Sequence, residues 1–251
     1  KPPPATPRSA VPEPRRFNVI ETFGPTMQGE GPHAGRVVGF VRFGGCDFRC
    51  SWCDSMYAVD PAQVRANSEK LTAAEIVDRL PPCNVVVLSG GNPALIEGDQ
   101  LADALADAGK EFHVETQGTV WRPWLSRAAQ LVVSPKPPSS GEHRKSEVAA
   151  PRFFEQVNRT MGWLGDTALK IVVADLADLE WALLLRDEVD PDRVMDFYLS
   201  ALTPPDATLE QLAASYRSLC DLVLDSAIAV AHDPVVLPQL HVVAWGHERG
   251  V

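Results

Sequence analysis

Three cysteines lie within eight residues of one another in the segment GGCDFRCSWCDS, which runs from Gly44 to Ser55. Cys46, Cys50 and Cys53 have the spacing C-x3-C-x2-C, and the whole chain has only five cysteines. Three thiols are too many for one disulfide and too few for a closed zinc site, which takes four ligands. Thiolates also hold iron–sulfur clusters, generally with four cysteines for a [4Fe–4S] cubane. Three thiolates on such a cluster would leave one iron open to another ligand.

Two other uses of these thiols stay open at this point. A structural zinc site needs a second pair of ligands, but Cys83 and Cys220 are isolated. His33 lies on the wrong side of the predicted strand 36–43, and His113 lies inside the predicted strand 111–115. A redox C-x-x-C pair would leave Cys46 without a role. An odd, clustered set of cysteines is typical of metal binding in a reducing cytosol. We therefore expect a cytoplasmic protein.

A glycine pair lies in the segment LSGGNP (88–93), at the end of an apolar run that predicts a strand. Glycines let a backbone approach a ligand closely. This segment and the cysteine spacing, with Trp52 before the last cysteine, resemble the radical S-adenosylmethionine (SAM) superfamily, with Asn92 where Glu is commoner. The resemblance implies a [4Fe–4S] cluster whose open iron binds SAM. In that superfamily an electron from the reduced cluster cleaves SAM to a 5′-deoxyadenosyl radical.

Strand and helix patterns alternate along the rest of the chain. The predicted strands are 36–43, 84–89, 111–115, 130–134, 169–174, 194–202 and 240–245, and the predicted helices are 71–80, 99–109, 175–189 and 208–225. Such alternation is typical of parallel βαβ units in one sheet or barrel. Six or seven strands are too few to close a full β/α barrel. We therefore expect an α/β fold, a partial (open) β/α barrel of about six parallel strands, of the radical SAM type.

Two stretches fall outside this alternation. Residues 1–16 hold prolines at positions 2, 3, 4, 7, 12 and 14, so we expect a disordered, Pro-rich leader before a single domain at 17–251. The segment 134–152 is rich in Pro, Ser and charge, which predicts a long surface loop or a lid. Helix starts are clearer. Thr72 with Glu75, and Thr208 with Gln211, have the spacing of a capping box.

Polar or glycine-rich residues follow several of the predicted strands at the point where each strand ends. Cys46, Ser89-Gly90-Gly91, Glu115-Thr116 and Ser134-Pro135-Lys136 all have this position. In parallel sheets and barrels, ligands bind at the carboxyl ends of the strands. The sequence therefore predicts that these residues share one cleft.

Composition excludes some classes of partner. The chain has 251 residues and a formal net charge of −10, which argues against a broad surface for nucleic acid or for anionic membranes. No apolar run approaches the roughly 20 residues that span a bilayer. The first residues, KPPPATPRSAVPEPRR, lack the apolar core of a secretory signal. We expect neither nucleic-acid nor membrane partners.

Four segments resemble the 7-carboxy-7-deazaguanine synthase family: TMQGEGPHAGRVVGFVRFGGCDFRCSWCDS (26–55), HVETQGT (113–119), VVSPKPP (132–138) and LPQLHVVAW (237–245). The resemblance implies a lyase that converts 6-carboxy-5,6,7,8-tetrahydropterin to 7-carboxy-7-deazaguanine with loss of ammonia. It also implies Mg²⁺ and SAM as cofactors, SAM being regenerated. The implied partners are the pterin substrate, a flavodoxin or ferredoxin as electron donor, and a second copy in a homodimer. The product could serve queuosine in tRNA or secondary metabolites.

The resemblance also implies roles for individual residues. Cys46, Cys50 and Cys53 would hold the cluster. Ser55 stands where the family binds Mg²⁺ through Thr, with Asp54 as a competing carboxylate ligand, because Mg²⁺ prefers oxygen. Arg42 would bind the substrate carboxylate through its planar fork. Further substrate contacts would come from Met27, Gln28, Gly29, Glu30, Ser89 and His241. SAM contacts would come from Gly91, Glu115, Ser134, Pro135, Lys136 and Ser200.

Two alternatives remain beside this interpretation. Another radical SAM enzyme, such as a glycyl-radical activase, would share the cysteine spacing but would not need the Q-G-E-G segment at 28–31. A non-catalytic module binding zinc or a cluster would need only the cysteines.

Overall fold

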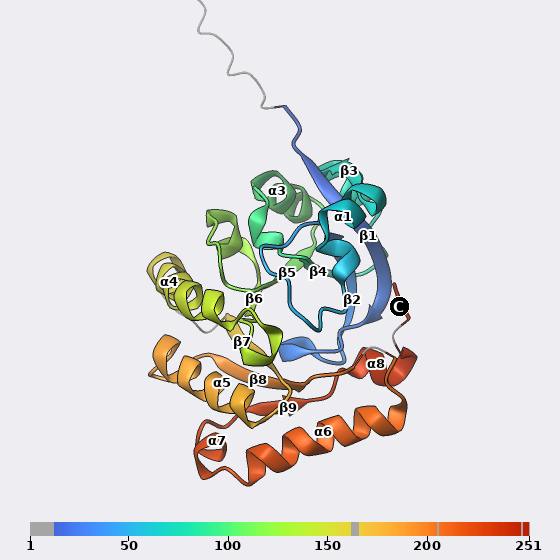
Figure 1. The fold of residues 1–251 in the computed structure, drawn as a ribbon. Coiled ribbons are helices and arrows are strands. Elements are labelled where there is room, and N and C mark those ends of the chain that lie inside the picture. The colour runs from blue at the N-terminus through green and yellow to red at the C-terminus, as the bar shows by residue number, and fades with distance from the viewer. Residues whose placement is uncertain (1–12, 162–165, 205, 247, 251) are drawn as a thin grey trace, which may run out of the picture.

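One open sheet organises the molecule (Figure 1). The computed structural model describes residues 13–161, 166–204, 206–246 and 248–250. Its nine strands lie in the order β3-β1-β2-β4-β5-β6-β7-β8-β9. The strands are β1 (Arg16–Met27), β2 (Val37–Phe43), β3 (Glu69–Thr72), β4 (Val85–Gly90), β5 (Glu111–Thr116), β6 (Gln130–Val133), β7 (Thr167–Val173), β8 (Asp196–Ala201) and β9 (Val235–Leu237).

Seven consecutive strands of the sheet are parallel to one another: β2, β4, β5, β6, β7, β8 and β9. Only β1 runs antiparallel, to β2 on one side and to β3 on the other. The predicted open β/α barrel of about six parallel strands is confirmed. A short β9 adds a seventh. Because the strands are parallel, the carboxyl ends of β2 and β4 through β9 face one edge.

The helices are α1 (Pro61–Asn67), α2 (Ala73–Asp78), α3 (Asp99–Asp107), α4 (His143–Met161), α5 (Leu176–Val189), α6 (Leu209–Leu224), α7 (Ala227–Ala231) and α8 (Leu240–Trp245). Figure 1 shows α3, α4, α5 and α6 around the outer side of the curved sheet. The core lies between sheet and helices, where Leu88 of β4, Leu101 of α3 and Leu169 of β7 are fully buried. Strands that are buried on both faces have nearly continuous apolar sequences, without alternation of polar residues.

Both predicted capping boxes are present. Thr72 and Glu75 exchange hydrogen bonds at the start of α2, and Thr208 and Gln211 do so at the start of α6. Each box satisfies backbone N–H groups that have no partner within the helix, which fixes where the helix begins.

The structure corrects two predicted elements. Residues 240–245 form α8 rather than a strand. The predicted loop or lid at 134–152 contains the 3₁₀ helix η5 (Pro138–Ser140) and the first half of α4. Helix α4 buries Ala150, Phe153, Phe154 and Val157 on one face, so this segment packs on the sheet and does not form a free lid.

Of the predicted leader, residues 1–12 lie outside the described residues. Its last residues are bound to the domain: the backbone N–H of Arg15 donates to Oε1 of Gln100 at 2.7 Å, and Nε2 of Gln100 donates to the carbonyl of Glu13. Arg16 already belongs to β1. The predicted boundary at residue 16 is therefore too late, while the single domain itself stays a prediction. Within the described ranges, no helix has both the length and the apolar character that a membrane span requires.

Candidate functional site

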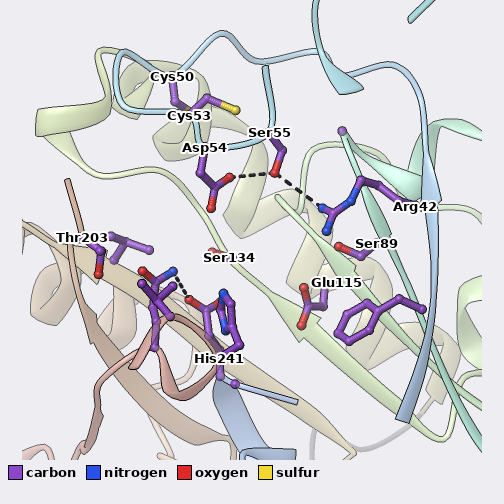
Figure 2. A pocket seen from close by; sticks show the side chains of 18 of the residues that line it. Arg42, Cys50, Cys53, Asp54, Ser55, Ser89, Glu115, Ser134, Thr203 and His241 are labelled. Atoms are coloured by element: carbon purple, nitrogen blue, oxygen red, sulfur yellow. Dashed lines mark hydrogen bonds between the residues drawn. The ribbon is translucent and has the colours of Figure 1, made fainter. Parts of the chain in front are cut away.

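A pocket of about 340 Å³ opens at the carboxyl edge of the sheet (Figure 2). Its wall includes Cys46 after β2, Ser89-Gly90-Gly91 at β4, Glu115-Thr116 at β5, and Ser134 with Lys136 after β6. The predicted shared cleft is therefore present. Figure 2 shows Cys50 and Cys53 on one side and His241 on the other.

Glycines allow the cysteine loop to lie against the end of β4. A Cβ built on Gly90 would be 2.1 Å from the carbonyl oxygen of Phe43, and one on Gly91 would be 2.0 Å from that of Gly45. Gly90 also has φ +132, a conformation that L side chains rarely adopt. Glycine is thus the residue that this close approach of two backbones requires.

The cysteine loop also rests on the segment that follows β6. The backbone N–H of Ser51 donates to the carbonyl of Ser140 at 3.0 Å, and Nε1 of Trp52 donates to Oγ of Ser139 at 3.1 Å. The backbone N–H of Arg49 donates to Oε1 of Glu142 at 2.8 Å. The segment that was expected to be a loop or lid therefore supports the cysteine loop from behind.

Asn92 connects the cysteine loop to two strands. Its Nδ2 donates to Oδ1 of Asp47 at 2.8 Å and to Oγ1 of Thr119 at 3.0 Å, and its Oδ1 accepts from Thr116 and from the backbone N–H of Ala94. The side chain is 1% exposed. An amide has two donors and one acceptor oxygen, and here all are used. Asn92 thus fixes Asp47, the neighbour of Cys46, relative to β4 and β5.

All three cysteines of the loop are free thiols on the pocket wall. Burial raises the pKa of Cys46 to about 11 and also raises the pKa of Cys50 and Cys53, while Lys136 acts in the opposite direction on all three. Such thiols stay protonated at neutral pH until a metal replaces the proton. Three thiols that face one cavity, beside a lysine that favours their ionised form, fit an iron–sulfur cluster with one open iron.

A single zinc ion has different requirements. Its ligands sit about 2.3 Å from one centre, so their donor atoms must converge. In the part of the chain that the structure describes, no group of three Cys, His, Asp or Glu side chains converges in that way. The described residues therefore offer no preformed site for a single zinc ion.

Ser55 lies between an acid and a base. Its Oγ donates to Oδ1 of Asp54 at 2.7 Å, and Nη1 of Arg42 donates to Oγ at 3.5 Å (Figure 2). Arg42 itself is held by Glu21, whose Oε1 accepts from Nε at 2.7 Å. The other oxygen of Glu21 accepts from Nε of Arg249 at 2.9 Å. The hydroxyl of Ser55 and the carboxylate of Asp54 together form an oxygen pair suited to a hard cation.

Glu30 is held by two partners on the pocket wall. Its Oε2 forms an ion pair with Lys170 of β7, and its Oε1 accepts from Nε2 of Gln239 at 2.5 Å. Burial alone would raise the pKa of Glu30, but Lys170 and His241 hold it well below its usual range. Glu30 is therefore a carboxylate throughout the physiological range of pH.

The first turn of α8 contacts the loop that carries Glu30. The backbone N–H of Leu240 donates to the carbonyl of Gly29 at 3.0 Å. A Cβ on Gly29 would come within 2.0 Å of Nδ1 of His241, so the ring lies directly on this glycine. On the other side of the loop, Nε2 of Gln28 donates to Oε1 of Glu115 at 2.8 Å. The Gln28–Glu30 loop is held from both sides.

Most of the predicted site residues line this one pocket. They are Met27, Gln28, Gly29, Glu30, Arg42, Cys46, Cys50, Cys53, Ser55, Ser89, Gly91, Glu115, Ser134, Lys136 and His241. Pro135 and Ser200 do not line it, and both are buried. In β8 the side chain of Ser200 is 1% exposed, and Thr203, beyond the strand end, reaches the pocket in its place. His241 reaches it from a helix, and not from the predicted strand.

Sequence reasoning missed Lys170 and Gln239. Lys170 had a signal: it is the one charged residue in the apolar run LKIVVA (169–174), and a lysine in such a strand is rarely buried unless it is paired. Gln239 lies in the segment LPQLHVVAW (237–245) that resembles the family, but nothing local in that segment indicates its partner Glu30, which lies 209 positions away.

The chain is similar to known proteins over most of its length. The family model of the radical SAM superfamily matches residues 40–134. The 7-carboxy-7-deazaguanine synthase of Bacillus cereus is 34% identical over 250 residues, which cover 94% of this chain and 99% of the relative. The synthase of Bacillus subtilis is 33% identical over 93% of this chain and 98% of its own, and that of Pyrobaculum aerophilum is 30% identical over 94% and 97%.

A solved structure shares the fold. The crystal structure of QueE from Escherichia coli superposes with a TM-score of 0.64, covering 90% of this chain and 95% of that chain. Its sequence identity is 19%, so this likeness bears on the fold alone.

Proposed function

This chain belongs to the 7-carboxy-7-deazaguanine synthase family of the radical SAM superfamily, and we propose that its pocket converts 6-carboxy-5,6,7,8-tetrahydropterin to 7-carboxy-7-deazaguanine with loss of ammonia. The observation that carries the proposal is the set of residues that line one pocket. Cys46, Cys50 and Cys53 share a single pocket with the Gln28–Glu30 loop and the ends of β4, β5 and β6. Radical generation and pterin binding thus have one common site.

The cysteine loop would hold the cluster, and the strand ends beside it would hold SAM. When bound, the reduced cluster and SAM supply the 5′-deoxyadenosyl radical that removes hydrogen from the substrate. Lys136, whose Nζ lies 3.1 Å from Oγ of Ser134, is placed to bind the anionic or ribose oxygens of SAM. Glu115 and Thr203 line the same pocket. Gly91 allows a close backbone approach, although its carbonyl already accepts from Gln117 at 2.7 Å.

The substrate would lie between Arg42 and the Gln28–Glu30 loop. Arg42 is held by Glu21 through Nε, which leaves Nη groups to bind the substrate carboxylate. At the other end, Gln28 and Glu30 offer an amide and a carboxylate to the polar edge of the pterin. Ser89 and Met27 line the space between these ends, and His241 borders it.

Mg²⁺ would bind at Ser55, with Asp54 as the nearest carboxylate. The cation prefers oxygen ligands and retains several waters, so few protein atoms are needed. A cation at Ser55 would also lie next to Arg42. The two positive groups would then hold the same substrate carboxylate from adjacent positions.

We further propose a cytoplasmic location, a flavodoxin or ferredoxin as electron donor, and a homodimer. The free cysteines support a reducing compartment. Leu224 and Ile228, at α6 and α7, are 72% and 67% exposed and support a protein contact there. Size-exclusion chromatography with light scattering tests the dimer. Reduction kinetics with each purified donor test the electron source.

Anaerobic reconstitution with iron and sulfide tests the proposed chemistry. We expect a brown protein with about four irons per chain. With reductant, SAM, Mg²⁺ and the carboxytetrahydropterin, it should release 7-carboxy-7-deazaguanine and leave SAM unconsumed. Cys50→Ala should bind little iron and produce no deazapurine. Bound zinc without iron would contradict both the cluster and the enzyme. A cluster-loaded protein that cleaves SAM but makes no deazapurine would point to another radical SAM enzyme, such as a glycyl-radical activase.

A further inference from the structure

Lys170 and Glu30 form a buried ion pair on the pocket wall. The side chain of Lys170 is 7% exposed and that of Glu30 is 14% exposed. Lys170 projects from β7 and Glu30 from the loop after β1, and both line the pocket. Gln239, before α8, binds the second carboxylate oxygen at 2.5 Å. Glu30 is therefore fixed by two elements that are distant from it in sequence.

The two contacts leave part of Glu30 free. An ionised carboxylate offers about four lone-pair positions on two oxygens, and each contact uses one. Each oxygen of Glu30 therefore keeps an acceptor position. Because Lys170 and Gln239 each bind a different oxygen, the plane of the carboxylate is fixed, and the free positions have a defined direction.

Stability does not account for this pair. A buried ion pair contributes little to folding, since the loss of hydration offsets the attraction, and apolar residues of similar volume often serve as well. Burial alone would lower the pKa of Lys170, but the charges of Glu30, Glu115 and Asp54 raise it. His241 is a further titratable group that faces Glu30 and helps to lower the pKa of that carboxyl. The arrangement instead keeps a carboxylate charged where burial would favour its neutral form.

We propose that Lys170 and Gln239 are positioning residues, which hold Glu30 as an oriented carboxylate that selects ligands with two adjacent N–H donors. This inference rests on the proposed function, in which Glu30 faces the guanidine-type edge of the pterin. The two residues act through Glu30. They determine which substrates bind, and the chemistry at the far end of the pocket does not depend on them.

Direct binding measurements on the cluster-loaded protein with SAM, without reductant, test this proposal. The probes are 6-carboxy-5,6,7,8-tetrahydropterin and the same molecule without its 2-amino group. Wild-type protein should prefer the amino form by about 10-fold to 100-fold, as expected for hydrogen bonds to a charged group. Lys170→Met and Gln239→Leu should lower that preference, and Lys170→Arg should restore part of it. Arg159→Met, which removes an exposed ion pair with Glu155, is the matched control and should bind as wild type.

The pH profile of binding gives a second readout. The affinity of each variant is compared with that of wild type at the same pH, because Glu30 stays ionised in wild type between about pH 8 and about pH 5. In Lys170→Met the lost cation lets burial raise the pKa of Glu30, so affinity relative to wild type should fall as the pH falls. A variant that only loosened the fold would lose affinity equally for both probes and at every pH, and that result would overturn the proposal.

A double-mutant cycle covers the case in which Lys170→Met does not fold because Glu30 is left charged and unpaired. Glu30→Gln combined with Lys170→Met removes both charges. If Lys170 acts through Glu30, the double variant should bind the pterin no more weakly than Glu30→Gln alone. A further loss in the double variant would show that Lys170 acts on its own. Deazapurine synthesis by the wild type tests the reaction separately, so failure of the proposed function is distinguishable from failure of this inference.

Discussion

The amide of Gln28 donates to the carboxylate of Glu115, with 2.8 Å between Nε2 and Oε1. This bond joins the loop proposed for the pterin to the strand end proposed for SAM. Oε1 of the same amide accepts from the backbone N–H of Gly29 at 2.9 Å. Both polar atoms of the Gln28 amide therefore hold the loop in place. The two ligands would therefore be in contact with a common pair of residues.

Substitution of each partner should separate these roles. Gln28→Leu should lower affinity for the pterin about 10-fold, as for a lost hydrogen bond to a charged group, with a smaller effect on SAM. Glu115→Leu should lower affinity for both ligands. Calorimetric titration with each ligand alone measures the two constants. If the two variants lost the same affinity for each ligand, Glu115 would serve only to hold Gln28.

Gly29→Ala should weaken substrate binding through a clash with the ring of His241. The new Cβ would also lie 2.8 Å from the backbone N of His241, so the start of α8 must move. We expect a loss of about 1–3 kcal/mol in the free energy of unfolding, as for overpacking, with a drop in pterin affinity. Gly109→Asn is the control, because Gly109 has open space and a φ of +66 that Asn tolerates. Wild-type affinity in Gly29→Ala would contradict the contact.

Asn92→Asp should reduce cluster retention. The change removes the donors to Asp47 and Thr119 and places a second carboxylate 2.8 Å from that of Asp47. Like charges at that separation repel, which loosens the loop that bears Cys46. Iron per chain after reconstitution and desalting is the measurement. Asn67→Asp, at the exposed end of α1, loses one similar bond and should retain iron as wild type does. Equal iron in both variants would exclude a positioning role for Asn92.

Ser55→Ala should raise the Mg²⁺ concentration needed for half-maximal turnover, because one oxygen ligand is lost. Ser55→Thr keeps the hydroxyl and should stay close to wild type. Turnover measured across a Mg²⁺ series gives the comparison, with Ser126→Ala, at a distant hydroxyl bound to Pro123, as control. If Asp54→Asn raises the requirement and Ser55→Ala does not, the carboxylate is the ligand in place of the hydroxyl.

Stability should decrease as the pH falls from about 7 toward about 5, because the buried His113 stacks on the partly buried His33. His33 and His113 have ring centroids 4.1 Å apart, and burial lowers the pKa of each. Arg36 disfavours their protonation, whereas Glu111 favours it. The unfolded chain therefore binds more protons than the folded protein in this range, so the free energy of unfolding decreases as the pH decreases. His33→Phe keeps a ring and removes one titration, and should give a shallower slope in urea unfolding. An unchanged slope would contradict the assignment.

The chemistry of the site could be predicted from spacing, whereas contacts between distant segments could not. The C-x3-C-x2-C spacing and the polar strand ends are local patterns, and parallel strands must bring such ends to one edge. The ion pair of Lys170 with Glu30 and the bond from Gln239 join residues far apart in sequence. No local pattern specifies such partners.

The two mistaken elements have separate physical reasons. LHVVAW (240–245) is a short apolar run, and such a run fits a strand or a buried helix equally well. In α4 the charged residues and Pro151 suggested a loop. The helical signal was present as Ala150, Phe153, Phe154 and Val157, which have the spacing of one helix face. In β1 the register shifts between Phe23 and Thr26, and this irregularity hides the strand pattern.

The contacts of the Gln28–Glu30 loop with residues 239–241 also constrain the order in which the pocket can form during synthesis. Partners of the cysteine loop, from Asn92 to Glu142, leave the ribosome well before Gln239 does. The hydrogen bond from Gln239 to Glu30 closes a separation of 209 residues, and such long-range contacts form late. A nascent chain would therefore complete the support for its cysteines first, and acquire its substrate-binding wall only when residues 239–241 have been made.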